Sequence, residues 1–74
     1  MINVRDSRLT KADRKILEFL QGGPKPFYRI KRGLNYSTRF LRLHLDRLYA
    51  LRYVGRFVGD DNLVYYRLRR EKVG

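Results

Sequence analysis

Three stretches of the chain repeat their apolar residues with the period of an α-helix. The first predicts a helix over residues 11–21, in which apolar side chains recur at spacings of three and four: Ala12, Ile16, Phe19 and Leu20. Thr10 suits the N-cap, and Asp13 is placed to complete a capping box. The run Gly22-Gly23-Pro24 predicts its end, because glycine accepts a left-handed cap and proline cannot continue a helix.

A shorter helix is predicted over residues 25–31. Pro26 suits a first helical turn, and Phe27, Ile30 and Leu34 supply an apolar edge. The run Gly33-Leu34-Asn35 predicts a break. A glycine-containing turn between two short helices is typical of a helix-turn-helix corner.

The third predicted helix covers residues 38–51 and has the clearest stripe, with Leu41, Leu45 and Leu48 at i, i+4 and i+7. Ser37 is its expected N-cap, with Asn35 as the alternative. The remaining positions divide by face: Arg39, Leu43, Asp46, Arg47 and Ala50 lie opposite the stripe, Arg42 lies on one flank, and Phe40, His44 and Leu51 lie on the other.

Beyond the third helix the period changes to two. Residues 53–58 and 63–69 are rich in β-branched and aromatic side chains and predict two strands, and residues 59–62 predict a hairpin loop. Alternation places Val64, Tyr66 and Leu68 against the helices. The predicted organisation is an arm over residues 1–8, one domain over 9–70 and a tail over 71–74.

Composition narrows the classes of function. At 74 residues the chain is one small domain, and the absence of cysteine excludes disulfides, thiolate metal sites and thiol nucleophiles. His44 is the only histidine, so no site can use two imidazoles. No apolar run is long enough for a membrane span and no signal peptide opens the chain, so we expect a soluble cytoplasmic protein without membrane contact, associated with a nucleoid or, if viral, in the host cytoplasm.

The net charge of +11 and the pI near 10.7 favour a polyanionic partner. The charge is uneven: residues 25–58 hold nine Lys and Arg against the single acid Asp46. A merely soluble surface would carry more evenly mixed signs. The sequence therefore favours nucleic acid over solubility alone.

The order of these elements resembles the winged helix-turn-helix fold, an α+β class of three helices followed by a two-stranded antiparallel hairpin, the wing. The segments similar to the turn, the recognition helix and the two wing strands are 33–38 (GLNYST), 44–48 (HLDRL), 53–54 (YV) and 65–68 (YYRL). The resemblance implies a DNA-binding transcriptional regulator of archaeal, viral or bacterial type. An acidic loop at Asp60 and Asp61, where a wing often meets phosphate, departs from this pattern.

The resemblance places the third helix in the major groove of double-stranded DNA, which is wide enough to admit one α-helix. The expected base-reading residues are Tyr36, Thr38, Arg39, Arg42 and Leu43, of which the arginines can bond guanine in bidentate fashion. Asp46 is expected to orient Arg42 or Arg47. The alternative for this face is a solvated helix surface.

Two further sets are expected to contact nucleic acid. The phosphate-binding set comprises Lys25, Tyr28, Arg29, Lys31, Arg32, Ser37 and Arg47, with Ser37 equally explained as a cap. The wing set comprises Arg56, Tyr65, Arg67 and Arg69, which can follow a minor groove or stack on single-stranded bases.

Apolar residues outside the leucine stripe suggest either closure over the core or a homodimer patch: Ile2, Val4, Phe40 and Leu51. Catalysis finds no support, because Ser37 and Thr38 lack an evident base and the acidic loop is too short to bind calcium. We expect no enzyme activity, cofactor or metal. The alternatives to a sequence-specific regulator are an RNA-binding or ribosome-associated protein and a module that coats DNA or assembles on it without sequence preference.

Overall fold

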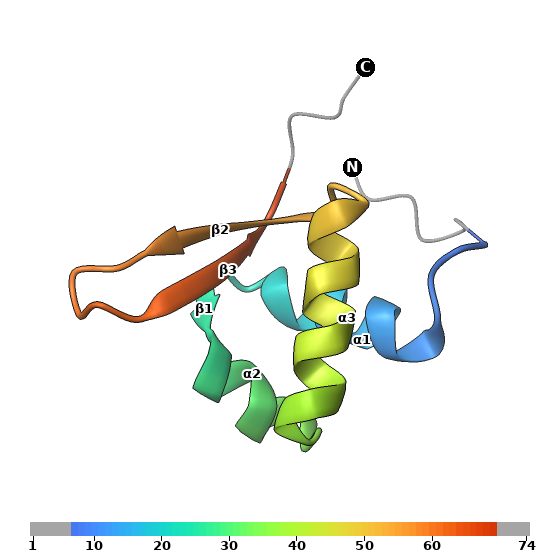
Figure 1. Cartoon of the computed structure of the whole chain (residues 1–74), viewed down its shortest axis with the longest axis horizontal. Coiled ribbons are helices and arrows are strands. Elements are labelled where there is room, and N and C mark those ends of the chain that lie inside the picture. Colours follow the sequence, from blue (N-terminus) through green and yellow to red (C-terminus); the bar gives the residue numbers. More distant parts are fainter. Residues whose placement is uncertain (1–6, 70–74) are drawn as a thin grey trace.

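The computed structural model describes residues 7–69. Its elements in chain order are α1 (Lys11–Leu20), β1 (Lys25–Pro26), α2 (Phe27–Leu34), α3 (Thr38–Ala50), β2 (Val54–Val58) and β3 (Val64–Leu68). The hairpin of β2 and β3 projects sideways from the three helices (Figure 1). Two of the proposed dimer residues, Ile2 and Val4, lie outside the described residues.

The capping box predicted for α1 is confirmed. The Asp13 backbone N–H donates to Thr10 Oγ1 at 3.1 Å, and the Thr10 N–H donates to Asp13 Oδ2 at 2.9 Å. The helix ends at Leu20, one residue before the predicted end. Gly23 then turns the chain at a φ of 121°, a value that L side chains rarely adopt.

The helix predicted over residues 25–31 was wrong at both ends. Lys25 and Pro26 instead form β1, which pairs antiparallel with β3 opposite Tyr66 and Tyr65. A proline is tolerated at a sheet edge because its missing N–H leaves no ladder bond unmade there. Pairing with the edge of β3 thus outweighs the local preference of Pro26 for a first helical turn.

Helix α2 ends within the run 33–35 that was predicted to break it. It continues through Gly33 and Leu34, and Asn35 ends it in the left-handed region at a φ of 59°. Gly33 has a packing role: a Cβ there would lie 2.5 Å from Cε1 of Phe19. The missing side chain therefore lets α1 and α2 pack closely.

The third helix agrees with its prediction to within one residue. Ser37 is the N-cap, since its Oγ accepts the Phe40 N–H at 3.1 Å, and Leu51 is the C-cap. Leu41, Leu45 and Leu48 are fully buried. The leucine stripe therefore anchors α3 to the core and turns the opposite face outward.

The sheet has the strand order β1-β3-β2, and all its pairs are antiparallel. Tyr66 and Leu68 face the helices as predicted, but Val64 is 44% exposed. Val64 pairs with Val58 next to the hairpin loop, at the end of β3 where the core no longer covers the strand. The prediction that Val64 packs on the helices was wrong for that reason.

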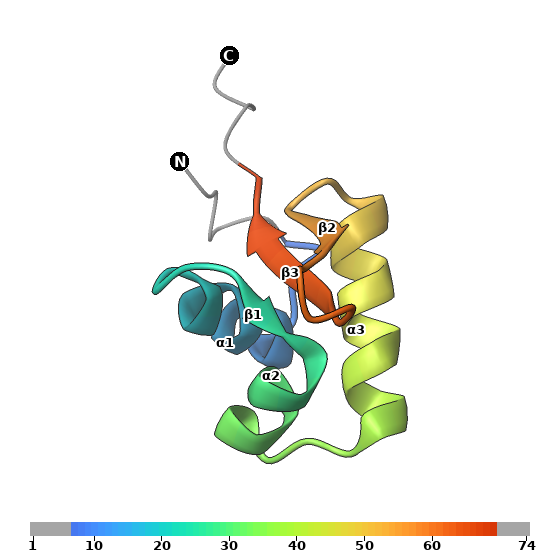
Figure 2. The same cartoon turned by 90° about the vertical axis from the view of Figure 1, so that its left-hand side faces the viewer.

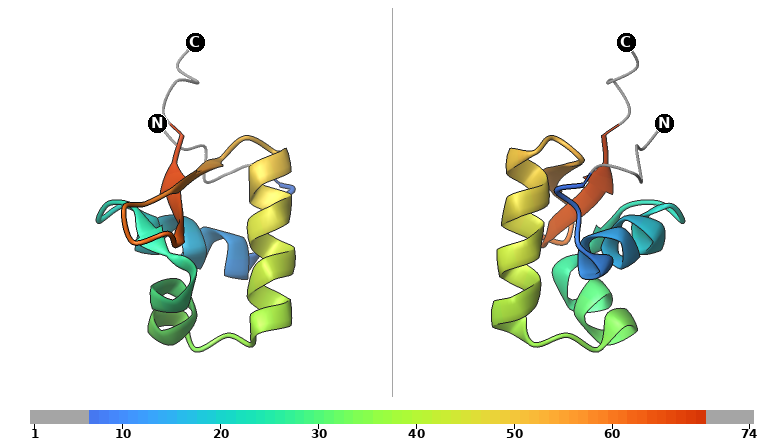
Figure 3. Two further views of the ribbon diagram at one scale, coloured as in Figure 1. Left: turned by 60° about the vertical axis from the view of Figure 1, so that its left-hand side comes forward. Right: turned by 90° about the vertical axis from the view of Figure 1, so that its right-hand side faces the viewer.

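The elements enclose one core. Figure 2 looks toward the hairpin, with α3 on one side, α1 on the other and α2 below, and the views of Figure 3 agree. The core comes from every helix and both long strands: Leu9, Ile16, Leu17, Leu20, Ile30, Leu41, Leu45, Leu48, Val54, Tyr66 and Leu68. This packing fixes the position of α3 relative to α2 and the hairpin.

Candidate nucleic-acid interface

A buried carboxylate holds α3 against α1. Asp13 is 0% exposed, and its Oδ1 lies 2.7 Å from His44 Nδ1 while its Oδ2 lies 3.4 Å from Arg47 Nε. The Arg47 guanidinium also donates to the Arg8 carbonyl. Sequence analysis gave Asp13 only a capping role, because nothing in a single sequence shows that a position in α1 meets α3.

Burial by itself raises the pKa of Asp13. The Thr10 N–H, the His44 hydrogen bond and the positive charges of His44 and Arg47 outweigh it, so the pKa lies below its ordinary value of 3.8. The carboxylate is therefore ionised at neutral pH and satisfied on both oxygens. It links His44 and Arg47 of α3 to the start of α1.

The outward face of α3 begins with Ser37, Thr38 and Arg39, all exposed. Leu43, one turn beyond Arg39, is 64% exposed. Within residues 7–69, Arg39 makes no hydrogen bond, ion pair or ring contact. The structure thus presents a cation and an apolar side chain side by side on a rigid helix.

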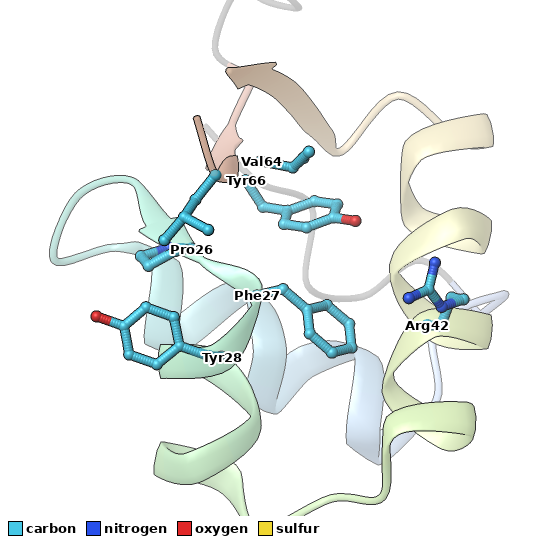
Figure 4. Close-up of a pocket in the computed structure, with 7 residues that line it drawn as sticks. Pro26, Phe27, Tyr28, Arg42, Val64 and Tyr66 are labelled. Carbon is cyan, nitrogen blue, oxygen red and sulfur yellow. The ribbon is translucent and has the colours of Figure 1, made fainter. Parts of the chain in front are cut away.

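Arg42 lies on the flank of α3 that faces α2 and the hairpin. Its guanidinium carbon is 5.4 Å from the centroid of the Phe27 ring, a cation–π contact. Figure 4 shows the side chain directed from α3 toward Phe27. The side chains of Arg42 and Arg39 therefore point in different directions, although both residues lie near the N-terminal end of the helix.

The two remaining charges on α3 have partners other than the expected ones. Asp46, expected to orient Arg42 or Arg47, instead forms an ion pair with Arg56 of β2, with 3.8 Å between Arg56 Nη1 and Asp46 Oδ1. Arg47 is drawn to Asp13, yet 41% of its side chain is exposed. The packing of α3 against α1 decides the Arg47 pairing, and the position of β2 beside α3 decides the Asp46 pairing. Helical spacing alone reveals neither.

Aromatic rings line the opposite flank of α3. Tyr36 lies 4.9 Å from Phe40 between ring centroids, and Phe40 lies 4.4 Å from His44, which reaches Asp13. Phe40 is 38% exposed, whereas Leu51 is partly buried against the core. Of the proposed dimer residues that the structure describes, Phe40 has the more accessible side chain.

The basic set proposed around α2 is divided between two elements. Lys25 lies on β1, with its Nζ 5.7 Å from the Phe19 ring centroid and donating to the Gly23 carbonyl at 3.2 Å. Lys31 is partly buried, whereas Arg29 and Arg32 are exposed. With Tyr28, these two arginines line a hollow of about 470 Å³ beside Phe19 and Gly33.

The wing residues are more firmly held than the sequence suggests. The Arg56 guanidinium lies 3.9 Å from the Tyr49 ring centroid, so it spans from β2 to the end of α3. Tyr65 stacks on Phe57 at 5.4 Å. Arg67 is exposed, and Arg69 is partly buried.

The acidic loop has a structural role. Asp61 accepts the Tyr65 hydroxyl at 2.7 Å and the Leu63 N–H at 3.1 Å, and both bonds lower the pKa of its carboxyl. Asn62 beside it has a φ of 66°. Asp61 thus closes the hairpin, while Asp60 is exposed at its tip.

Two solved structures share this architecture. The reduced form of the transcriptional regulator YodB from B. subtilis superposes with a TM-score of 0.80 at 23% identity, covering 96% of this chain and 78% of that one. A double mutant of ZitR from Lactococcus lactis gives 0.83 at 19% identity, covering 95% of this chain. The chain spans about half the length of ZitR, at 49%.

The fold is a winged helix-turn-helix. The α+β class and the winged-helix resemblance of the sequence are thereby confirmed, with β2 and β3 as the wing and β1 as a third strand that the sequence did not reveal. No family model and no curated protein matches the chain.

Residues 7–69 contain no candidate membrane span and no candidate metal site. None of the helices in this part of the chain has the length and apolar character needed to cross a bilayer. Nor do three or more His, Asp or Glu side chains of that part of the chain converge as metal ligands would.

Proposed function

We propose that this winged helix binds double-stranded DNA in a sequence-specific manner and regulates transcription, with the N-terminal half of α3 in the major groove. The observation that supports this proposal most directly is that Arg39 and Leu43 are exposed on a helix whose other side is fully buried. An arginine can bond guanine O6 and N7, and an apolar side chain can contact the thymine methyl group. The net charge of +11 supplies the attraction to the duplex.

The other basic residues support this proposal as backbone contacts. Arg29 and Arg32 are exposed on α2, which in this docking crosses the phosphates above the groove. Arg67 on the wing extends the basic surface. Ser37 and Arg47 keep their structural bonds and can still add phosphate contacts from exposed atoms.

Selection of binding sites from a random duplex library tests the proposal. We expect one enriched motif for the native chain. Arg39→Ala should reduce discrimination at one position by about 1–3 kcal/mol, whereas Arg32→Ala should weaken all duplexes alike. Lys15→Ala, on the exposed side of α1, removes the same charge and is the matched control.

The duplex selected from the library also separates this proposal from two alternatives, non-specific DNA coating and RNA binding. No enriched motif would point to a protein that coats DNA without preference. A structured RNA that displaces the selected duplex at equal salt would overturn double-stranded DNA as the partner.

We also propose a homodimer as the DNA-bound state, supported among the described residues by the exposed Phe40 ring beside Tyr36. Light scattering on the protein–DNA complex tests it. Two chains on each site are expected for the native protein and one for Phe40→Glu, whereas a single native chain on the selected site would contradict the dimer.

A further inference from the structure

A groove of about 360 Å³ lies where α2, α3 and the wing meet. Its walls are Pro26, Phe27, Tyr28, Arg42, Leu63, Val64 and Tyr66 (Figure 4). The volume falls within the range of small-molecule sites, which are mostly apolar with a few placed polar groups. The groove therefore has the size and the lining of a ligand site.

Arg42 is the one charged side chain in this lining, and no carboxylate accompanies it among the described residues. The guanidinium is held over the Phe27 ring but makes no hydrogen bond or ion pair within residues 7–69. A guanidinium carries five N–H donors, and its strongest partners are carboxylates and phosphates. The groove thus offers unused donors for an anion.

The opposite wall offers uncovered hydrocarbon. Leu63 and Val64 are 41% and 44% exposed although both are apolar, and Tyr28 is 48% exposed. The hairpin loop is fixed by the Asp61 bonds, so this wall is pre-formed. An inorganic anion alone would leave these side chains in contact with water.

We propose that the groove binds a small amphipathic carboxylate, with its anionic group on Arg42 and its ring or alkyl body between Phe27 and Val64. Occupancy fills the space between α3 and the wing, the two elements proposed to lie against DNA. Ligand and DNA then compete. The competition rests on the proposed function, whereas binding of the ligand does not.

Titration of the full chain with 2-naphthoate, without DNA and followed by amide NMR, tests the site. We expect saturable shifts confined to the amides of residues 27–28, 42 and 63–66. The neutral 2-naphthamide should bind about ten- to a hundredfold more weakly, because it loses the charge-assisted bonds to Arg42. Equal affinity for the two compounds, or shifts scattered over the basic surface, would overturn the proposal.

Variants separate the groove from general attraction to a basic protein. Arg42→Gln should weaken naphthoate by the same ten- to hundredfold factor. Arg39→Gln, three residues away and outside the groove, removes the same charge and should change affinity less than about threefold. Val64→Asp, which places a carboxylate in the opposite wall, should also expel the anion. Equal losses in the Arg39 and Arg42 variants would contradict a specific site.

Two further readouts keep the outcomes distinct. Saturating naphthoate should weaken binding to the selected duplex, and the Arg42→Gln variant should lose this sensitivity. Naphthoate binding without any effect on DNA would overturn the competition but not the site. Light scattering of the free protein tests whether a second copy of the chain fills the groove instead. A dimer that Leu63→Glu dissociates would show this, and would overturn the proposal of a small-molecule ligand.

Discussion

Asp13 is a buried carboxylate that links α1 to α3. It caps α1 through Thr10 and reaches across the core boundary to His44 and Arg47. A buried charge of this kind is tolerated because both oxygens are hydrogen-bonded. Removing the carboxylate leaves the Arg47 guanidinium without its counter-ion and the His44 ring without its hydrogen-bond partner.

We predict that Asp13→Asn lowers the free energy of unfolding by about 2 kcal/mol, since a neutral amide cannot satisfy all three partners. Chemical denaturation at neutral pH measures the change. Asp46→Asn is the matched control: this carboxylate is exposed and its ion pair with Arg56 is long, so we expect a change below about 0.5 kcal/mol. Equal effects of the two variants would contradict the role of Asp13.

The lowered pKa of Asp13 makes this contribution depend on pH. The folded state binds the proton more weakly than the unfolded chain, so the stabilisation is complete above the ordinary pKa of 3.8 and is lost as the pH falls. We predict that the stability difference between the native chain and Asp13→Asn shrinks between about pH 5 and pH 2. Denaturation curves across this range measure it, and a difference that grows toward acid would have the wrong sign.

At the scale of elements, the start of α3 combines two properties in one residue. Ser37 caps the helix through the Phe40 N–H, and its exposed position also suits a phosphate contact. The free energy of unfolding reports the capping role, and DNA affinity reports the phosphate contact. A substitution that keeps the cap but repels phosphate can therefore distinguish the two roles.

We predict that Ser37→Ala destabilises the fold by about 1 kcal/mol, because the cap bond is lost. Ser37→Asp should keep the stability, since an aspartate caps equally well and suits the positive helix end. Its added negative charge should nevertheless weaken DNA binding. Thermal unfolding and a duplex titration measure the two effects, and normal DNA affinity in Ser37→Asp would place phosphate away from this helix end.

For the whole molecule, charge is the dominant property. The chain has eighteen Lys and Arg against seven Asp and Glu, and two of these acids already have partners within the fold: Asp13 on α3 and Asp61 in the hairpin loop. The basic surface is therefore little neutralised from within.

We predict a steep salt dependence of DNA binding. If six to ten phosphates are neutralised, affinity should fall by about 10³–10⁵ between about 50 and 200 mM salt. The slope of log affinity against log salt measures the number of contacts, and Arg32→Ala should reduce it by about one. A flat dependence would exclude a phosphate-dominated complex.

The limits of sequence reasoning follow from particular residues. The leucine stripe of α3 and the caps at Thr10 and Ser37 could be read directly, because helical period and capping are local properties. Strand β1 could not, because two residues gain a strand conformation only from pairing with β3. The break predicted over residues 33–35 falls at Asn35, and the role of Gly33 could not be predicted for a similar reason, since that glycine accommodates the Phe19 ring of α1.

The candidate site likewise has features that could be predicted from the sequence and features that could not. The sequence by itself determined the order of the three helices and the two wing strands, the basic charge and the outward position of Arg39, all of which follow from composition and periodicity. Only the tertiary structure decided that Arg42 lies over Phe27, that Arg47 turns to Asp13 and that Asp46 meets Arg56. Long charged side chains take the partners that helix crossing and strand pairing bring within reach, and those neighbours are distant in the chain.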